Sequence, residues 1–313
     1  MNMFEKALLR AGPVVLDGGL ATELETQGFD IAGVLWSAAL LQTNPDAIVN
    51  AHRAYLDAGA DCIISASYQA SRMGFMSLGL SATASDQLIA GSVELACTAR
   101  SEFLAANPTT SRLPIVAASV GPYGAALADG SEYTGSYDIS AAELREFHSS
   151  RLEILDRSGA DVLACETIPD IVEAEVLCDL LRDVATPAWI AFSCRDEQRI
   201  SDGTLLSEAV ALFADHPRVL AIGINCTPPG LITALIGEVL KGAPQKAVVV
   251  YPNSGETYHA ANNTWSGVAC DLDGGCPVNE WRNAGAKFIG GCCRTGPADS
   301  AAVRARLKKQ AGR

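Results

Sequence analysis

The chain has 313 residues, of which 49% are hydrophobic, and its formal net charge is −13. A chain of this length can bury a large core, and a single α/β barrel of this size is ordinary. The acidic surface argues against binding to nucleic acids and to anionic membranes, because both select basic surfaces. We therefore expect small molecules as partners.

The first ten residues and the cysteines are used to predict the cellular compartment of the protein. Residues 1–10 include the charged Glu5, Lys6 and Arg10, so we expect no secretory signal, and no apolar run is long enough for a transmembrane helix. The ten cysteines are then expected to be reduced thiols rather than a disulfide framework. We expect a cytoplasmic protein in which residues 1–313 form one domain. No extra C-terminal arm suggests a dimer, so we expect a monomer.

Short apolar runs predict eight buried strands. In chain order they span residues 13–16, 62–67, 114–119, 162–165, 188–193, 219–225, 247–251 and 287–290. Amphipathic helices are predicted between them, including residues 47–58, 85–105, 140–158 and 170–184.

Strands that alternate with helices predict a parallel sheet. Eight strands in this chain give about 39 residues per unit, which favours a (β/α)8 TIM barrel with a long loop after the seventh strand. A doubly wound open sheet is the alternative. It is disfavoured because no GxGxxG follows the first strand, and Asp17-Gly18-Gly19-Leu20 does not fit a dinucleotide loop.

Polar and thiol side chains stand at the ends of the predicted strands. In such barrels these ends converge on one mouth, where the chemistry takes place. Read in order, they are Asp17, Ser65, Ser67, Ser119, Glu166, Ser193, Cys226, Asn253, Cys292 and Cys293. We expect the functional site to be built from them.

Cysteines follow two of these strands. Cys226 ends one strand, and Cys292 and Cys293 follow Gly290-Gly291 at the end of another. Neighbouring residues of a regular strand point to opposite faces, so we expect the two glycines to supply the unusual backbone angles that turn both cysteines towards one metal.

A set of three thiolates suits Zn²⁺ and leaves its fourth position open, as in a catalytic site. The net negative charge of such a site disfavours hydroxide formation and favours activation of a substrate thiol. The alternative is that the three cysteines are inert and pack as small apolar residues.

Two carboxylates stand among glycines and hydroxyls. Asp17 and Glu166 suit an α-ammonium group, although a turn residue and a helix cap are the alternatives. The backbone amides of Gly18 and Gly19, with Ser65 or Ser67, suit an α-carboxylate.

Aromatic residues follow the first and seventh strands. Trp36, Tyr251, Tyr258 and Trp265 would face a sulfonium cation through cation–π contact, and the alternative is that they are surface or packing residues.

Six segments together resemble one known family. They are residues 16–25 (LDGGLATELE), 65–71 (SASYQAS), 166–169 (ETIP), 223–226 (GINC), 251–256 (YPNSGE) and 290–294 (GGCCR). On these motifs the chain resembles the homocysteine S-methyltransferases, and it is most similar to the bacterial and plant branch that uses S-methylmethionine. The resemblance covers nearly the whole chain.

The resemblance implies a (β/α)8 barrel that binds homocysteine, with Zn²⁺ held by Cys226, Cys292 and Cys293. It implies that Asp17 and Glu166 hold the amino group of homocysteine. Its carboxylate would be held by Gly18 and a serine of the second strand, with Ser65 preferred to Ser67. We also count Gly19 and Asn225 among the substrate-binding residues.

The resemblance also suggests where the methyl donor binds. The related betaine enzymes have tyrosines where this chain has Gln69 and Thr167, which argues against betaine as donor. Trp36 matches an aromatic residue of that site. We therefore expect Trp36, Gln69, Thr167, Tyr251 and Asn253 on the donor side.

The expected reaction is the zinc-dependent transfer of a methyl group from a sulfonium donor to the thiol of L-homocysteine, which gives methionine. S-methylmethionine and S-adenosylmethionine both present such a methyl group. The alternatives are a methyltransferase for selenohomocysteine or selenocysteine, a barrel lyase or hydrolase with a zinc-bound water, and a non-enzymic zinc or thiol sensor.

Overall fold

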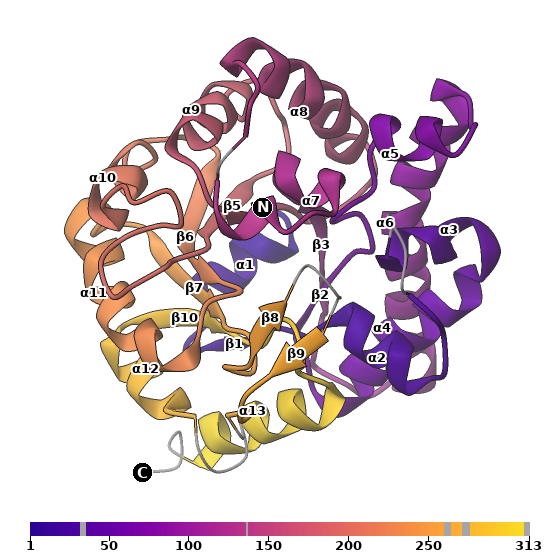
Figure 1. Cartoon of the computed structure of the whole chain (residues 1–313). Coiled ribbons are helices and arrows are strands. Elements are labelled where there is room, and N and C mark those ends of the chain that lie inside the picture. The colour runs from indigo at the N-terminus through magenta and orange to yellow at the C-terminus, as the bar shows by residue number, and fades with distance from the viewer. Residues whose placement is uncertain (32–35, 136, 260–263, 271–275, 310–313) are drawn as a thin grey trace.

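The computed structural model describes residues 1–31, 36–135, 137–259, 264–270 and 276–309. Within these residues, eight parallel strands form one sheet in the order β1-β10-β7-β6-β5-β4-β3-β2. A parallel bridge between Leu16 and Cys62 joins β1 to β2 and closes the sheet. The predicted (β/α)8 barrel is confirmed, and Figure 1 shows it with the β8–β9 hairpin in front of the ring of strands and α1 behind.

Each barrel strand overlaps one of the predicted apolar runs. The strands are β1 (Val14–Val15), β2 (Cys62–Ile64), β3 (Ile115–Val120), β4 (Val162–Ile168), β5 (Ala188–Phe192), β6 (Val219–Asn225), β7 (Ala247–Tyr251) and β10 (Ala286–Ile289). The long loop expected after the seventh strand contains an antiparallel hairpin formed by β8 (Thr257–His259) and β9 (Thr264–Ser266).

Helices surround the barrel (Figure 1). The outer helices are α4 (Pro45–Ala58), α6 (Ala82–Ala106), α8 (Ala141–Asp156), α9 (Ile171–Leu180), α10 (Leu206–Ala211), α11 (Ile232–Gly242), α12 (Val278–Ala284) and α13 (Pro297–Lys309). Shorter helices are α1 (Met3–Leu9), α2 (Leu20–Thr26), α3 (Leu40–Thr43), α5 (Arg72–Ser77), α7 (Tyr123–Leu127), η1 (Trp36–Ala39), η2 (Ser131–Tyr133) and η3 (Pro229–Leu231). The four predicted helices are confirmed as α4, α6, α8 and α9, although α9 ends before the predicted boundary. No helix of the described segments is long and apolar enough to cross a bilayer.

The first helix, α1, covers the end of the barrel at which the strands begin, opposite the mouth. Asn2 and Glu5 form a capping box that starts α1, with the Asn2 side chain accepting from the Glu5 N–H at 2.9 Å. Phe4 is fully buried, and its ring centre lies 5.2 Å from that of Phe288 and 5.8 Å from that of Trp189. This aromatic cluster packs α1 against β5 and β10 at the end of the barrel opposite the mouth.

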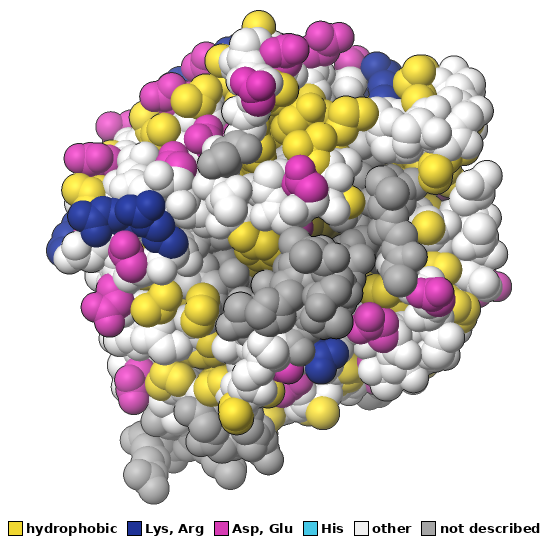
Figure 2. All heavy atoms as spheres, viewed as in Figure 1, with side chains coloured by type: hydrophobic (Ala, Val, Ile, Leu, Met, Phe, Trp, Pro, Cys, Tyr) yellow, Lys and Arg dark blue, Asp and Glu magenta, His cyan; other side chains and the backbone are white. Residues whose placement is uncertain are grey.

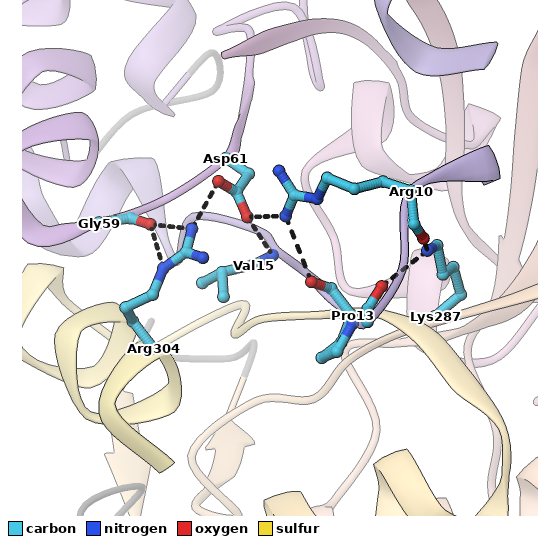
Figure 3. Close-up of polar contacts among 8 residues, drawn as sticks. Arg10, Pro13, Val15, Gly59, Asp61, Lys287 and Arg304 are labelled. Carbon is cyan, nitrogen blue, oxygen red and sulfur yellow. Dashed lines mark hydrogen bonds and ion pairs between the residues drawn. The ribbon is translucent and has the colours of Figure 1, made fainter. Parts of the chain in front are cut away.

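A buried carboxylate ties the chain together at the same end (Figure 3). Asp61 precedes β2 and pairs with Arg304 of α13 at 2.6 Å and with Arg10 at 2.9 Å. The Val15 N–H donates to the same carboxylate at 3.1 Å, and Arg304 also donates to the Gly59 carbonyl at 2.9 Å. Burial alone would raise the pKa of Asp61, but the two guanidinium groups hold it below its ordinary value.

We expect Asp61→Asn to lower the free energy of unfolding by about 3 kcal/mol at pH 7, because it leaves Arg304 without its buried partner. A lowered pKa in the folded state means that the ionised carboxylate stabilises the fold above pH ~4 and that this contribution is lost as the pH falls. Urea titrations at pH 7 and at lower pH should therefore show the difference between wild type and variant shrinking in acid.

The matched control is Asp57→Asn, because Asp57 is exposed and pairs with Arg53 at 3.4 Å on the surface of α4. It should change the free energy of unfolding by less than about 1 kcal/mol. Equal effects of the two substitutions would contradict the role assigned to Asp61.

Candidate metal centre and substrate cavity

Three thiols from two strand ends meet at the mouth of the barrel. Cys226 follows β6, and Cys292 and Cys293 follow β10. The Cys293 Sγ atom lies 3.7 Å from that of Cys226 and 3.9 Å from that of Cys292, and all three sulfur atoms lie within 4.8 Å of one another. The structure therefore brings together the three cysteines selected from the sequence.

This cluster has the spacing that a tetrahedral metal ion requires. Thiolates at Zn–S distances of about 2.3 Å lie ~3.8 Å apart in an ideal tetrahedron, which the two measured separations match. Hydrogen bonds from Cys226 and Cys292 hold the pKa of the Cys293 thiol well below its ordinary value, which favours its thiolate form. The cluster can hold a metal ion, and its sulfur atoms suit a soft or borderline ion.

The backbone around β7 holds the two cysteine segments in place. The Cys226 N–H donates to the Tyr251 carbonyl at 3.2 Å, and the Cys292 N–H donates to the Pro252 carbonyl at 2.8 Å. The Cys293 carbonyl accepts from the Ser254 N–H at 3.1 Å. Because β7 lies between β6 and β10 in the sheet, its end acts as a template that fixes the distance between the thiols.

The two glycines before the cysteine pair were predicted to supply unusual backbone angles, and this prediction is wrong. Neither Gly290 nor Gly291 has a positive φ angle, and the left-handed residue of this turn is Arg294, with φ of 65°. Glycine is needed for close approach instead. A Cβ atom on Gly290 would lie 2.5 Å from the Leu16 Cβ, and one on Gly291 would overlap the side chain of Thr295. The end of β10 can therefore lie directly against the segment that follows β1.

The two predicted carboxylates are buried at the mouth of the barrel, where Glu166 borders the cavity and Asp17 is absent from its described lining. Asp17 accepts from the Ile64 N–H at 2.7 Å through one oxygen, and its other oxygen has no partner among the described residues. Glu166 accepts from the Ser119 hydroxyl. Burial raises the pKa of Asp17, and the charge of Glu166 raises it further. Burial raises the pKa of Glu166 to about 7, against hydrogen bonds from Ser119 and Tyr251. Among the described residues, neither carboxyl group has the cationic partner that would favour its ionised form.

The predicted carboxylate-binding groups are only partly available. The Gly19 N–H already donates to the Thr295 carbonyl at 2.9 Å, so it is engaged within the fold. Ser67 has no exposed surface and donates to the Ser119 carbonyl at 2.8 Å. Ser65 borders the cavity together with Gly18, whereas Ser67 is absent from the described lining. The Ser65 hydroxyl donates to that of Ser67 at 2.8 Å and accepts from the Ser119 N–H at 3.1 Å. The geometry thus favours Gly18 and Ser65 over Gly19 and Ser67.

Asn225 has a clear structural role at the end of β6. Its Oδ1 accepts from the Thr167 N–H at 2.6 Å, and its Nδ2 donates to the Thr167 hydroxyl at 2.7 Å. These bonds hold Thr167 at φ of 61°, where the β4–β5 register shifts between Cys165 and Ile168. Asn225 thereby orients the residue that follows Glu166, and both Asn225 and Thr167 border the cavity.

The other predicted donor-side residues are scattered. Gln69 borders the cavity, and its Nε2 donates to the Ala125 carbonyl at 3.0 Å. Asn253 accepts from the Gly255 N–H at 2.9 Å, as a turn residue does, and is absent from the described lining. The side chains of Trp36, Tyr258 and Trp265 lie outside the described part of the structure.

Tyr251 lies deeper than its predicted donor-side role would suggest. Its side chain is 1% exposed, and its hydroxyl accepts from the Trp189 Nε1–H at 3.1 Å. The same hydroxyl forms a hydrogen bond with Glu166. Tyr251 therefore supports the carboxylate of Glu166.

A cavity of about 260 Å³ lies at the mouth of the barrel, and the three cysteines, Glu166 and Ser65 are part of its lining. Its lining includes residues that sequence reasoning did not assign, among them Phe29 and Tyr68. Tyr133 is another, and its hydroxyl lies 4.0 Å from the Cys293 Sγ. Tyr68 directly follows the predicted serines, so its place in the SASYQAS motif was an available signal. Tyr133 lies in a polar stretch far along the chain from the cysteines, and nothing local in the sequence connects the two.

One pair of cysteines departs from the expectation of reduced thiols. Cys270 and Cys276 form a disulfide with a Cα–Cα distance of 5.7 Å. The pair is six residues apart in the loop after β7, and the Cys270 N–H donates to the Ser254 carbonyl at 2.5 Å. The prediction of free thiols is wrong for this pair because the folded loop brings it together. The eight other cysteines are free.

Comparisons with known proteins identify the family to which the chain belongs. The family model for homocysteine S-methyltransferase matches residues 14–307. A homocysteine S-methyltransferase of Escherichia coli is 50% identical over 299 residues, covering 94% of each chain. A selenocysteine Se-methyltransferase of Brassica oleracea is 43% identical over 318 residues, covering 96% of this chain and 91% of the other. The crystal structure of the Escherichia coli homocysteine methyltransferase MmuM in its metallated form superposes with a TM-score of 0.87 at 45% identity, covering 97% of this chain and 99% of that one.

The barrel, the thiol cluster and the buried carboxylates define an enzyme with a small-molecule cavity at the mouth of a (β/α)8 barrel. The chain belongs to the homocysteine S-methyltransferase family, as the resemblance predicted.

We expect Gly290→Ala to lower the free energy of unfolding by about 1–3 kcal/mol, because the added methyl group would force β10 away from Leu16. The displacement would also move the cysteine pair, so the metal content after purification should fall. Gly296→Ala is the control, because nothing lies within 4 Å of a Cβ at that position. Urea unfolding and metal analysis of both variants test this, and equal effects would contradict the close-approach argument.

Proposed function

We propose that this protein transfers a methyl group from a sulfonium donor to the thiol of L-homocysteine, with Zn²⁺ as its metal and methionine as its product. The observation that carries the proposal is the cluster of three sulfur atoms within 4.8 Å at the wall of a cavity that also contains Glu166. Family membership supports the enzyme over a non-enzymic sensor.

Cys226, Cys292 and Cys293 would hold the zinc ion. A zinc ion bound by three thiolates supplies a fourth position at which a substrate thiol ionises near neutral pH. This thiol-rich ligand set disfavours the lyase or hydrolase alternative, because it is a poor generator of hydroxide. The metallated crystal structure of MmuM supports a metal in this family.

The acceptor binds with its amino group between Asp17 and Glu166. One oxygen of Asp17 has no hydrogen-bond partner among the described residues, and the pKa of both carboxyl groups is raised. Both features are expected of a pocket that binds an ammonium ion. The acceptor carboxylate binds the Gly18 N–H and the Ser65 hydroxyl. Tyr251 keeps Glu166 in position.

The charge of the cavity supports a cationic donor. Glu25, Asp30 and Glu166 line it, and Arg294 is the basic residue of the described lining. The Arg294 guanidinium already pairs with Glu256 at 3.2 Å. Viewed from the mouth, acidic side chains are distributed around the face, whereas most basic ones gather at its left edge (Figure 2). S-methylmethionine and S-adenosylmethionine both carry a sulfonium charge that such a cavity attracts.

In the transfer step, the homocysteine thiolate attacks the methyl carbon in line with the bond to the donor sulfur. A new carbon–sulfur bond forms, and the electron pair of the broken bond neutralises the sulfonium. No general base is needed for this step, because the thiol has already lost its proton. The residues of the cavity contribute mainly by aligning the thiolate, the methyl group and the leaving sulfur.

A selenium acceptor is a second candidate. The relative named selenocysteine Se-methyltransferase is 43% identical to this chain and supports it. Selenocysteine is shorter than homocysteine by one methylene group, so it would reach the metal only if its amino group sat closer to the thiols. Comparing the two acceptors at equal donor concentration distinguishes the proposals.

With S-methylmethionine as donor, we expect two methionines for each donor consumed, because the methylated acceptor and the demethylated donor are the same compound. Incubation of the zinc-loaded protein with both substrates and quantification of methionine test this. No methionine from S-methylmethionine or from S-adenosylmethionine would overturn the proposed function.

Cys226→Ala should lose both zinc and methyl transfer, because two thiolates remain where three are needed. Activity should fall by at least about 1,000-fold if the metal is required to ionise the thiol. Cys97→Ala is the control, since Cys97 lies on α6, remote in sequence from the cluster, and is one of the free cysteines. Full activity of a zinc-free Cys226→Ala protein would contradict the metal assignment.

Asp17→Asn should raise the KM for homocysteine by about 10- to 100-fold, because a neutral amide binds an ammonium ion less tightly by about 1.5–3 kcal/mol. The KM for the donor should change little. An acceptor without the amino group, 4-mercaptobutanoate, isolates the contact, since its transfer rate should be nearly equal in wild type and variant. A similar loss with both acceptors would show that Asp17 acts on the fold and not on the amino group.

A further inference from the structure

A turn after β3 brings two unassigned side chains to the thiol cluster. The turn is η2, which ends at Tyr133, and the Tyr133 hydroxyl lies 4.0 Å from the Cys293 Sγ. Its ring borders the cavity beside the metal ligands. An acceptor thiol held by the cluster would therefore have Tyr133 as a neighbour at the place where the methyl group arrives.

Tyr68, at the end of the β2 segment, borders the same part of the cavity. Its hydroxyl forms a hydrogen bond with Thr167, which Asn225 in turn holds in place. Its ring packs on Gly121, where a Cβ atom would lie 2.8 Å from the ring carbon Cδ2. The absence of a side chain at Gly121 thus leaves the space that the Tyr68 ring occupies, and the hydrogen bond fixes its orientation.

Glu132 places a carboxyl group beside these tyrosines. It is 2% exposed, and its Oε2 atom has no hydrogen-bond partner among the described residues. It lies close enough to Tyr68 and Cys293 for their charges to interact. Burial raises the pKa of Glu132 to about 7, and no Lys or Arg of the described residues forms an ion pair with it.

The turn that carries Glu132 and Tyr133 is firmly packed. The Glu132 carbonyl accepts from the Ser193 hydroxyl at 3.4 Å, and the Glu132 backbone lies so close to α7 that a Cβ on Gly124 would come within 2.5 Å of its nitrogen. A buried acidic side chain without a cation on a well-held turn is costly, and such groups commonly serve a ligand.

We propose that Tyr68, Tyr133 and Glu132 form the subsite that recognises the positive charge of the methyl donor. This inference rests on the proposed function and specifies which side chains select the donor. The two rings border the space next to the thiols and attract the sulfonium through their π faces, and Glu132 behind them supplies the opposite charge. The acceptor carboxylates Asp17 and Glu166 are then left free to bind the amino group of homocysteine.

The subsite comes from the end of β2 and from η2, whereas the sequence suggested aromatic donor contacts on the loop after β7, where the side chains of Tyr258 and Trp265 lie outside the described residues. It also accounts for donor choice in terms of charge, because a neutral thioether gains nothing from Glu132. Methionine, the product on the donor side, is therefore released once the sulfonium charge has been transferred away with the methyl group.

The test separates donor binding from acceptor binding. Glu132→Gln and Tyr133→Leu should each raise the KM for S-methylmethionine by about tenfold or more, whereas Tyr133→Phe keeps the ring and should change it less than threefold. The KM for homocysteine and the zinc content should stay within twofold of wild type in all three variants. Glu197→Gln is the matched control, because it removes the same charge at an exposed position on the loop after β5.

Calorimetric titration of S-methylmethionine into the zinc-loaded proteins gives a second readout that does not depend on turnover. Donor affinity should fall in Glu132→Gln and Tyr133→Leu in proportion to the rise in KM. Unchanged donor affinity in both variants, with active wild type, would overturn this subsite and leave the proposed function intact. A wild type that neither binds nor demethylates any sulfonium donor would overturn both.

Discussion

The close approach of the end of β10 to the segment after β1 is the constraint on which the site depends. Gly290 and Gly291 have no side chains to hold the two segments apart, and the Gly291 N–H donates to the Asp17 carbonyl at 3.0 Å. Thr295 then packs against Gly18 and accepts from the Gly19 N–H. One contact between neighbouring strands thus sets a thiol pair beside a carboxylate, although the two lie more than 270 residues apart in the chain.

Three buried carboxyl groups at or near the cavity form no ion pair with the described residues. Asp17, Glu132 and Glu166 are buried carboxyl groups with raised pKa values, and burial is the largest cause in each. At the other end of the barrel, Asp61 is also buried but has two guanidinium partners and a lowered pKa. The contrast separates two uses of a buried acid. The fold completes the charge at Asp61, whereas Glu166, which lines the cavity, and the buried Asp17 and Glu132 near it have no ion pair with the described residues.

The strands and the metal ligands were predictable because their signals are local. Each barrel strand is a short apolar run; Cys226 directly follows one of them, and Cys292 and Cys293 follow another after Gly290-Gly291. The role of Gly290 and Gly291 was not predictable. Glycine is found both where the backbone needs a left-handed angle and where two segments approach closely, so the sequence alone does not distinguish the two. Tyr133 and Glu132 were missed because a connecting segment carries them to the cluster, where η2 packs against α7 and β4.

Strained backbone positions gather around the same cavity. Thr167, Cys226 and Arg294 have φ angles of 61°, 46° and 65°, a conformation that costs such residues about 1–3 kcal/mol each. Each is held by a specific hydrogen bond, to Asn225, the Tyr251 carbonyl and the Thr22 hydroxyl respectively. All three border the cavity. The three positions lie at the ends of β4, β6 and β10, so strained backbone fixes the chain direction at three of the strand ends around the cavity. A reaction whose rate depends on alignment benefits when the fold fixes those directions before the substrates bind.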